Sequence, residues 1–544
     1  MPLNLGVPRT LTSRSELVLP PGWDATPPDD IRQLTPWVHY IRVYRVEHGT
    51  LIEEKTITIL QSKIPVASWP EYKKFTDVVS PGTYPYVQLT RSSPPADSAG
   101  PPQPIKDDPK ARGLVNEAAE ANQHHQIDHA GELIKQAKAI NNEQPFLWSV
   151  AGYRAMLQGE VTEAVTDFAH ELELHPNEGN IYPLMASAQM AEGKRLDAEV
   201  TLRRRLKTIG PDPDVAIGLV QMLLEDGNSK DAVGIAEDAS QADFANQRLR
   251  VLLGRARIKN GQKAAGAATL FVVLRETEDP GLRNDIAYEL ADADQATQEV
   301  EDASRKSVEQ LTAESAKWTL STAEQDISEM RSRSNLLVAS WDTLGWTIYK
   351  SRTGHEPERL EEAKRYVASA WQNSPRPEVG LHLGELEEAQ HHFAEALGTY
   401  QLARATAPDF DLRGVRQPPT GIQRDLTARI DRLKKTHPQA VIKEPNEKLK
   451  DELKLDAGPS HGQSIVAPYR LLLAAGGVES AVRIESSDGD HGKPDIRRDL
   501  DRFRRAIPAS WVPPGSGARV LRSAVLNCHQ EICEVMVTPL SATR

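Results

Sequence analysis

The sequence predicts a mainly α-helical protein, a solenoid of stacked helix pairs flanked by an N-terminal β-rich domain and a C-terminal small α+β domain. Three patterns support this prediction. Small residues recur every 34 positions in the middle of the chain, apolar and polar residues alternate near its start, and strand-like runs return near its end. At 544 residues, the chain is long enough for several folding units.

Composition argues against several classes of protein. The 77 acidic and 65 basic side chains give a formal charge of −12, whereas a nucleic-acid-binding protein usually presents a basic face. No apolar run approaches the length of about 18 residues that a membrane-spanning helix needs. The two cysteines are too few for a disulfide scaffold or a four-cysteine zinc site.

Residues 1–92 are predicted to form the β-rich domain. Apolar and polar residues alternate at 37–46 and 55–60, which predicts an antiparallel hairpin with its turn at 47–50 and one buried face. Apolar residues then recur at spacings of three and four through 69–79, which indicates a short helix packed on the sheet. Residues 93–110 are rich in proline and serine, so we expect an extended linker there.

Residues 111–435 carry the internal repeat and are predicted to form the solenoid. Two series of small residues advance in steps of 34: Gly159, Gly193, Gly227 and Gly261, and Ala130, Ala164, Ala198 and Ala232. Five copies follow one another from 111 to 280, the pattern is irregular through 281–337, and it returns near Trp341 and at 377–410. The sequence therefore predicts about seven repeats and leaves room for a divergent eighth.

The fullest copy, 145–178, has small residues at its eighth and twentieth places, glycine at the fifteenth and proline at the thirty-second. Small residues allow the two helices of a pair to approach closely, and glycine and proline end the helices. This pattern resembles the tetratricopeptide repeat, a pair of antiparallel helices. We expect these residues to pack within the repeats: Trp148, Gly152, Ala164, Ala198, Ala232, Gly345, Ala363, Gly384 and Ala396.

After the solenoid, residues 436–464 are rich in lysine and glutamate and are predicted to form a mobile linker. Residues 465–544 contain four strand-like runs and one amphipathic helix, which predicts a small α+β domain. Cys528 and Cys533 lie at a turn between two of these strands. They would form a disulfide in an oxidising compartment or remain two thiols in a reducing one.

Three stretches, at 37–89, 342–346 and 519–537, resemble large bacterial envelope proteins of uncharacterised function. Those proteins have a transglutaminase-like core, a β-domain, tetratricopeptide repeats and a small domain with a cysteine pair. Their catalytic core would precede Pro2 and is absent from this sequence. The resemblance implies a periplasmic or envelope location, whereas the first residues lack a signal peptide, which would favour the cytoplasm.

Candidate chemical sites are weak. His124 and His129 have helical spacing and His391 adjoins His392, but no glutamate lies between the first pair as in a zinc-protease motif. Cys528 precedes His529 without any pattern that would supply an oxyanion hole. No phosphate-binding glycine motif follows a strand. We therefore expect no catalytic residue, metal or cofactor, and no enzyme activity.

A cationic stripe is the strongest candidate binding surface. In copy 247–280, Arg248, Arg255 and Lys259 have spacings of seven and four, so they share one face of helix A, the first helix of the pair. The neighbouring copies offer polar side chains on the same wall: Ser149, Tyr153, Asn180, Ser187, Asp214 and Gln221. These residues predict an acidic peptide or a chain-terminal carboxylate as the partner. The alternative is a solvated stripe that pairs with glutamates of the next repeat.

The sequence thus predicts a non-enzymatic scaffold that binds a protein or peptide in the concave groove of the solenoid. Two other functions remain open, the accessory half of a split transglutaminase-like enzyme and a self-assembling structural component of the envelope. No nucleic-acid partner is expected, and the sequence does not determine the oligomeric state.

Overall fold

The computed structural model of the chain forms two compact units, Met1–Lys106 and Asp107–Arg544, and each is described here by itself. The structure describes residues 3–4, 9–19, 23–27, 30–47, 49–61, 63–65, 68–79, 88–91, 107–320, 324–407, 419–440, 453–460, 465–484, 495–529, 531–538 and 540. Most of the linker predicted at 93–110 lies outside the described residues.

The N-terminal unit is built on a four-stranded antiparallel sheet in the order β2-β6-β5-β4. Its strands are β2 (Arg9–Val18), β4 (Ile31–Leu34), β5 (Val38–Glu47) and β6 (Thr50–Ile59). Two short antiparallel pairs accompany it: β1 (Leu3–Asn4) with β7 (Lys63–Ile64), and β3 (Trp23–Thr26) with β8 (Gln88–Arg91). The second hairpin strand begins at Thr50, earlier than the alternation at 55–60 indicates.

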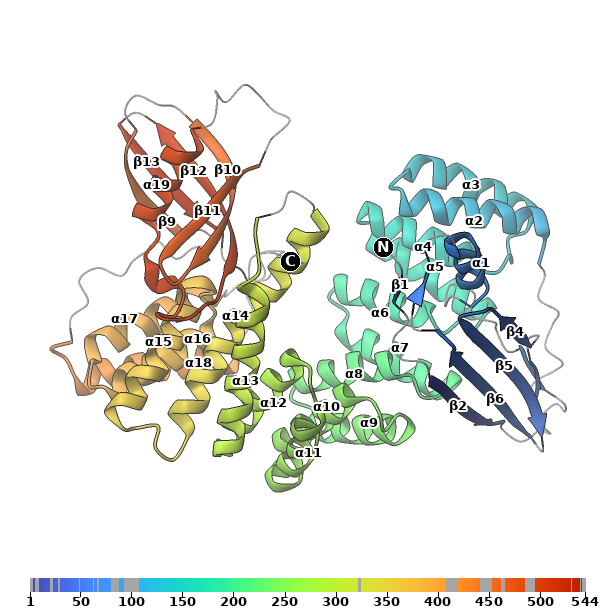
Figure 1. Cartoon of the computed structure of the whole chain (residues 1–544), viewed down its shortest axis with the longest axis horizontal. Helices are drawn as coiled ribbons and strands as arrows, with labels where there is room; N and C mark the ends of the chain where they lie inside the picture. Colours follow the sequence, from blue (N-terminus) through green and yellow to red (C-terminus); the bar gives the residue numbers. More distant parts are fainter. Residues whose placement is uncertain are drawn as a thin grey trace. The chain divides into compact units, whose positions relative to one another are not determined.

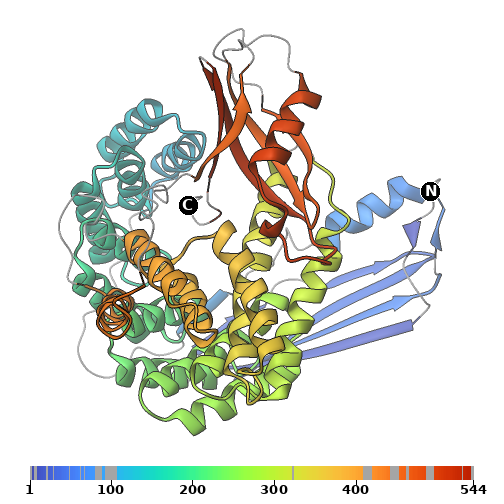
Figure 2. The ribbon, with the colours of Figure 1, turned by 90° about the vertical axis from the view of Figure 1, so that its left-hand side faces the viewer.

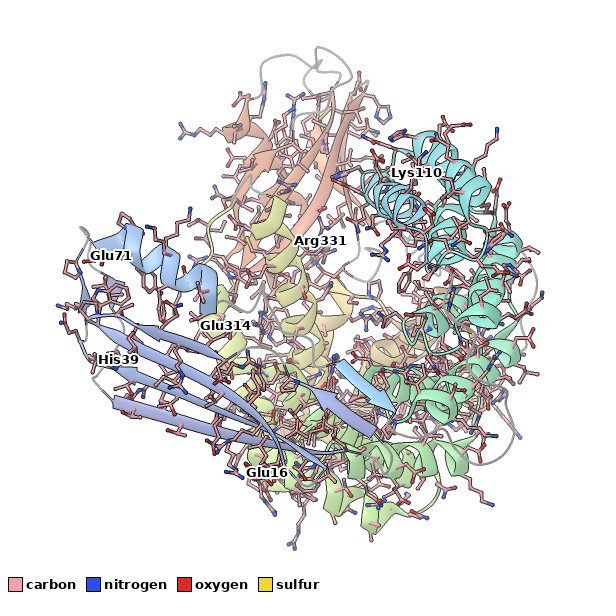
Figure 3. The ribbon with its side chains drawn as sticks, turned by 90° about the vertical axis from the view of Figure 1, so that its right-hand side faces the viewer. Glu16, His39, Glu71, Lys110, Glu314 and Arg331 are labelled. Atoms are coloured by element: carbon pink, nitrogen blue, oxygen red, sulfur yellow. A yellow bond between two sulfur atoms is a disulfide. The ribbon has the colours of Figure 1, made fainter. Side chains whose placement is uncertain are left out.

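Helix α1 (Trp69–Val79) packs on one face of this sheet, as its apolar spacing predicts. The Trp37 ring lies edge-on to Tyr72 and Phe75, with centroid distances of 5.9 and 6.0 Å. Figure 3 shows α1, which carries the labelled Glu71, above the strands that carry Glu16 and His39. These aromatic contacts bury Trp37 and the start of β5 against α1.

The second unit contains an α-solenoid of tetratricopeptide type, whose helix pairs follow one another in chain order (Figure 1). Its helices are α2 (Pro109–Gln123), α3 (Ile127–Ile140), α4 (Leu147–Gln158), α5 (Val161–Leu174), α6 (Ile181–Ala191), α7 (Arg195–Ile209), α8 (Pro213–Glu225), α9 (Ser229–Ala242), α10 (Gln247–Lys259), α11 (Lys263–Glu276), α12 (Pro280–Asp292), α13 (Gln298–Ser315), α14 (Glu324–Lys350), α15 (Pro357–Asn373), α16 (Pro377–Ala389), α17 (Phe393–Thr406) and α18 (Gly421–Thr436).

The small residues of the repeat lie where the two helices of a pair touch. A Cβ atom at Gly152 would lie 2.9 Å from the Phe168 ring and 3.2 Å from the carbonyl oxygen of Ala164. Ala164, Ala198, Ala232, Ala363 and Ala396 are fully buried. Trp341 is also fully buried, whereas Trp148 is only partly buried and donates an indole hydrogen bond to the Asn142 carbonyl. Trp148 therefore lies at the edge of its repeat core.

The irregular region 281–337 contains a further helix pair, α12 and α13, followed by the start of α14. Helix α12 begins with Pro280 after Asp279, whose side chain accepts a hydrogen bond from the Leu282 amide. Helix α13 has 18 residues, whereas α11 has 14, so the 34-residue register is lost. This pair is the divergent eighth repeat that the sequence left open.

The C-terminal region, which we call the tail, forms a five-stranded antiparallel sheet in the order β11-β10-β12-β13-β9. Its elements are β9 (Leu453–Pro459), β10 (Ile465–Ala474), β11 (Gly477–Arg483), α19 (Ile496–Ala506), the 3₁₀ helix η2 (Ala509–Trp511), β12 (Val520–His529) and β13 (Ile532–Val537). The predicted linker 436–464 is wrong at 453–459. That stretch is an edge strand that pairs, among the described strands, only with β13, and it lacks the apolar run of a central strand.

The tail packs against the solenoid instead of hanging from a mobile linker, which corrects the predicted arrangement (Figure 2). Ile327 and Met330 of α14 share an apolar cluster with Leu472 and Leu521 of the tail sheet. The Leu521 amide donates a hydrogen bond to Ser334 Oγ at 2.9 Å. The extra length of α14, 27 residues, supplies this contact surface.

Further hydrogen bonds join the tail to α15. Asn373 Nδ2 donates to the Trp511 carbonyl at 2.6 Å, and Ser369 Oγ donates to the Ser510 carbonyl at 2.9 Å. The guanidinium of the buried Arg522 donates to Asn373 Oδ1 at 2.7 Å and to the Thr538 carbonyl at 2.7 Å. The tail and the last repeats thus form one continuous core.

Cys528 and Cys533 lie directly opposite each other on β12 and β13 and form a disulfide.

Among the described helices, none combines the length and the apolar character needed to cross a membrane.

Candidate functional site

The candidate site is the wall formed by the first helices of successive pairs, which line the concave side of such a solenoid. Along this wall α10 contacts α12, α12 contacts α14, and α14 contacts α16. Helix α18 follows and contacts α16. We call the surface formed by α10, α12, α14 and α16 the groove wall.

Most of the predicted partner-binding residues are exposed. Exposed side chains are found at Tyr153, Asn180, Ser187, Asp214, Gln221, Arg248 and Lys259. Ser149 is a wrong prediction, because it is only 7% exposed and its Oγ donates to the Phe146 carbonyl at 2.8 Å. Its amide donates to the buried Glu171 carboxylate, so Ser149 belongs to the helix start and not to a binding surface.

The cationic stripe of α10 divides into one paired and two unpaired side chains. Arg255 Nε lies 2.7 Å from Glu289 Oε1 of α12, and Glu289 is 7% exposed. For Arg255, the alternative of pairing with the next repeat is therefore correct. Arg248 and Lys259 form no ion pair with any described residue and remain exposed.

Beyond α10 the groove wall is acidic, a feature that the sequence reasoning missed. The copy that contains α12 has carboxylates at its fifth, ninth and twelfth places, and the next two copies have them at some of these places: Asp285, Glu289, Asp292, Asp342, Glu385 and Glu388. Burial raises the pKa of Glu289 and Glu385, although nearby arginines oppose the shift. Reading these places in the irregular copy would have found the cluster.

A buried histidine lies beneath the acidic part of the wall. His382 Nδ1 is 3.0 and 3.1 Å from the two carboxylate oxygens of Asp342, and His382 is 3% exposed. Burial alone would lower the pKa of His382, but the Asp342 carboxylate outweighs it and the pKa is raised. The Trp346 ring stacks on the imidazole at 4.1 Å. The pair therefore stabilises the packing of α14 on α16.

Helix α18 neutralises the acidic side chains at the far end of the wall. Arg429 lies 2.7 Å from Glu385, and Arg432 lies 2.7 Å from Glu388, whose carboxylate also accepts a hydrogen bond from the Tyr400 hydroxyl. Asp292 of α12 forms no ion pair with any described residue. Within the part of the chain that the structure describes, Arg248 and Lys259 on α10 and Asp285 and Asp292 on α12 thus form no ion pair.

Comparisons with known proteins find helical repeat proteins of low similarity. No family model matches the sequence, and no curated protein matches it. A tetratricopeptide repeat protein from Parabacteroides merdae is 10% identical, covering 60% of this chain and 99% of that one, with a TM-score of 0.34. PilF of Pseudomonas aeruginosa is 14% identical over 48% of this chain and 94% of its own, with a TM-score of 0.29.

A third solved structure is YrrB, described as a tetratricopeptide protein with an unusual peptide-binding site. It is 14% identical, covering 32% of this chain and 91% of that chain, with a TM-score of 0.27.

The residues considered for metal binding or thiol chemistry do not form a site. His124, His125 and His129 are exposed, as are His391 and His392. Among the described residues, no three His, Cys, Asp or Glu side chains are grouped so that they could hold a metal ion. The sulfur atoms of Cys528 and Cys533 are bonded to each other. What the geometry offers is a charged wall.

Proposed function

We propose that this protein is a non-enzymatic scaffold that binds a partner protein or peptide along the groove wall. The observation that carries the proposal is the exposed and unpaired state of Arg248 and Lys259 on α10, which are available to an acidic group. Guanidinium and ammonium groups that are not already paired can form charge-assisted hydrogen bonds with carboxylates. The carboxylates of α12 confine an acidic segment to the α10 end.

The test uses the full chain with acidic, basic and neutral peptides. Acidic peptides should bind best, and changing both Arg248→Glu and Lys259→Glu should weaken their binding at least tenfold, because two attractive charges become repulsive. Arg255 is left unchanged, since changing it to Glu would place a second carboxylate beside that of Glu289. Binding is measured by fluorescence anisotropy at two salt concentrations.

The control changes Lys207→Glu and Lys230→Glu, two exposed lysines on the second helices α7 and α9. This variant has the same change in net charge and should bind acidic peptides like the wild type. Equal affinity of the groove variant and the wild type would contradict the proposal.

We further propose that the protein acts in the bacterial cell envelope, in association with a transglutaminase-like enzyme. The resemblance of 37–89 and 519–537 to envelope proteins supports this role, and the Cys528–Cys533 disulfide is compatible with an oxidising compartment. In this role the chain would position substrates or partners for a catalytic core on another segment or chain.

The compartment can be tested by thiol titration of protein isolated under alkylating conditions from its native source. We expect no free thiol before reduction and two after it, because both cysteines would be oxidised in the periplasm. Two free thiols before reduction would contradict an envelope location.

A further inference from the structure

A cavity of about 310 Å³ lies between α3, α4 and α5, on helices that do not belong to the groove wall. Its volume is at the small end of the range for ligand pockets. Gly131 and Lys135 of α3, Arg154 of α4, and Glu163 and Asp167 of α5 are among its lining residues. Charged side chains of both signs thus surround one small space.

Asp167 is the unusual residue of this cavity. It is 7% exposed, and no described residue donates a hydrogen bond to it or forms an ion pair with it. Burying an unpaired carboxylate is unfavourable, and a folded protein normally provides such a group with a partner. Burial raises the pKa of Asp167 to about 6, although the charge of Lys138 opposes the shift. Asp167 thus lines the cavity without a hydrogen-bond or ion-pair partner among the described residues.

Two of the nearby cations have other contacts. Lys138 Nζ lies over the Trp148 ring, 3.7 Å from its centroid. Arg154 Nε donates to the Ile127 carbonyl at 3.0 Å, and its guanidinium lies where a side chain at Gly131 would be, 3.0 Å from an added Cβ. Lys135 is exposed and forms no ion pair with a described residue. The cavity therefore offers an unpaired carboxylate and an unpaired ammonium group together.

We propose that this cavity binds a small zwitterion, a free amino acid or a whole dipeptide, with its ammonium group on Asp167 and its carboxylate toward Lys135 and Arg154. A ligand with only a positive charge would be repelled by the lysines and Arg154, and one with only a negative charge by Asp167 and Glu163. A zwitterion places its ammonium group near the carboxylates and its carboxylate near the cationic side chains. This inference does not depend on the groove wall, because it uses other helices.

The test measures binding of glycine, L-leucine, L-lysine and glycylglycine to the full chain by calorimetry, with methylammonium and acetate as single-charge analogues. At least one zwitterion should show binding at ligand concentrations below roughly 10 mM. A site with a Kd of about 1 mM would be nearly saturated at that concentration. Both analogues should bind at least tenfold more weakly. Absence of binding by all four zwitterions, or equal binding of a single-charge analogue, would overturn the proposal.

The variant Asp167→Asn should lose at least tenfold in affinity for the zwitterion, because the amide cannot form an ion pair with the ammonium group. It should unfold at the same or a higher temperature than the wild type, since it removes a buried unpaired charge. The matched control is Glu173→Gln on the same helix, whose exposed carboxylate lies outside the cavity. Unchanged affinity of the Asp167→Asn variant would overturn the proposal.

A second variant, Lys135→Met, tests the other end of the ligand at an exposed position and should also bind the zwitterion more weakly.

Binding by the wild type should weaken as the pH falls below about 6, where Asp167 becomes protonated. Lys138 of α3 and Glu163 and His170 of α5 act on Asp167 electrostatically, and Lys135 of α3 and Arg154 of α4 line the same cavity. Binding that is independent of pH from 8 to 5, or unaffected by Lys135→Met, would contradict the proposed orientation.

Discussion

Replacing Arg522 with alanine should lower the free energy of unfolding by about 3 kcal/mol, because it leaves buried hydrogen-bond acceptors unpaired and opens a cavity. Arg522 is fully buried and donates to the Asn373 side chain, the Asn373 carbonyl and the Thr538 carbonyl. Its guanidinium lies over the Trp511 ring at 5.3 Å. The variant should separate the tail from α15, as measured by urea denaturation with tryptophan fluorescence.

The control for this prediction is Arg497→Ala, an exposed arginine of the tail helix α19 that forms no ion pair with a described residue. It should change stability by less than about 0.5 kcal/mol. If the Arg522→Ala variant unfolds at the same urea concentration as the wild type, the tail is not held on the solenoid by this residue.

The substitution Gly345→Ala should destabilise the solenoid by about 1–3 kcal/mol, because it overpacks the contact between α14 and α15. A Cβ atom at Gly345 would lie 2.5 Å from Val367 Cγ2 and 2.7 Å from the Ala363 carbonyl oxygen. One of these is a backbone atom, so rotation of a side chain cannot relieve the clash. Thermal unfolding followed by circular dichroism measures the effect.

Gly218→Ala is the matched control, since Gly218 lies within α8 and an added Cβ would meet nothing within 4 Å. Alanine is the better helix former, so this variant should be more stable by about 0.5–1 kcal/mol. The same mutation should therefore have opposite signs at the two sites. A stabilised Gly345→Ala variant would show that the helices can move apart at no cost.

The repeats were predictable because their signal is local. Gly152, Ala164 and their equivalents recur at a fixed spacing, and each is required by a contact within one pair of helices. The pair α12–α13 was predicted only in outline, because the longer α13 shifts every later position. At this point, therefore, the sequence did not show which residues occupy equivalent places in the repeat register.

The docking of the tail could not be predicted, because it depends on residues far apart in the chain. Arg522 and Asn373 are separated by 149 positions, and neither belongs to a recognisable motif. A buried arginine in a strand cannot be distinguished from an exposed one by alternation alone. The sequence did not predict edge strand β9 for a related reason. What holds this segment as a strand is mainly its pairing with β13.

The candidate binding wall was predicted in part. Arg248 and Lys259 are exposed as expected, but the ion pair of Arg255 with Glu289 depends on a helix in the irregular region. Ser149 was assigned to the wall from its polarity, whereas its hydroxyl bonds to the backbone of its own helix. Polarity and spacing give the face of a helix but not the partner of a side chain.

The attachment of the tail to α14 and α15 has a consequence for how the length of this protein can change in evolution. The earlier helices, from α2 to α11, contact their neighbours in the stack, and each unit begins and ends at an equivalent loop. Duplication or loss of a whole 34-residue unit there preserves every tail contact described above. The same event between α13 and α15 would separate Ser334 from Asn373 and break the tail's binding surface. Homologues should therefore vary in repeat number on the N-terminal side and keep the last repeats and the tail as one inherited block.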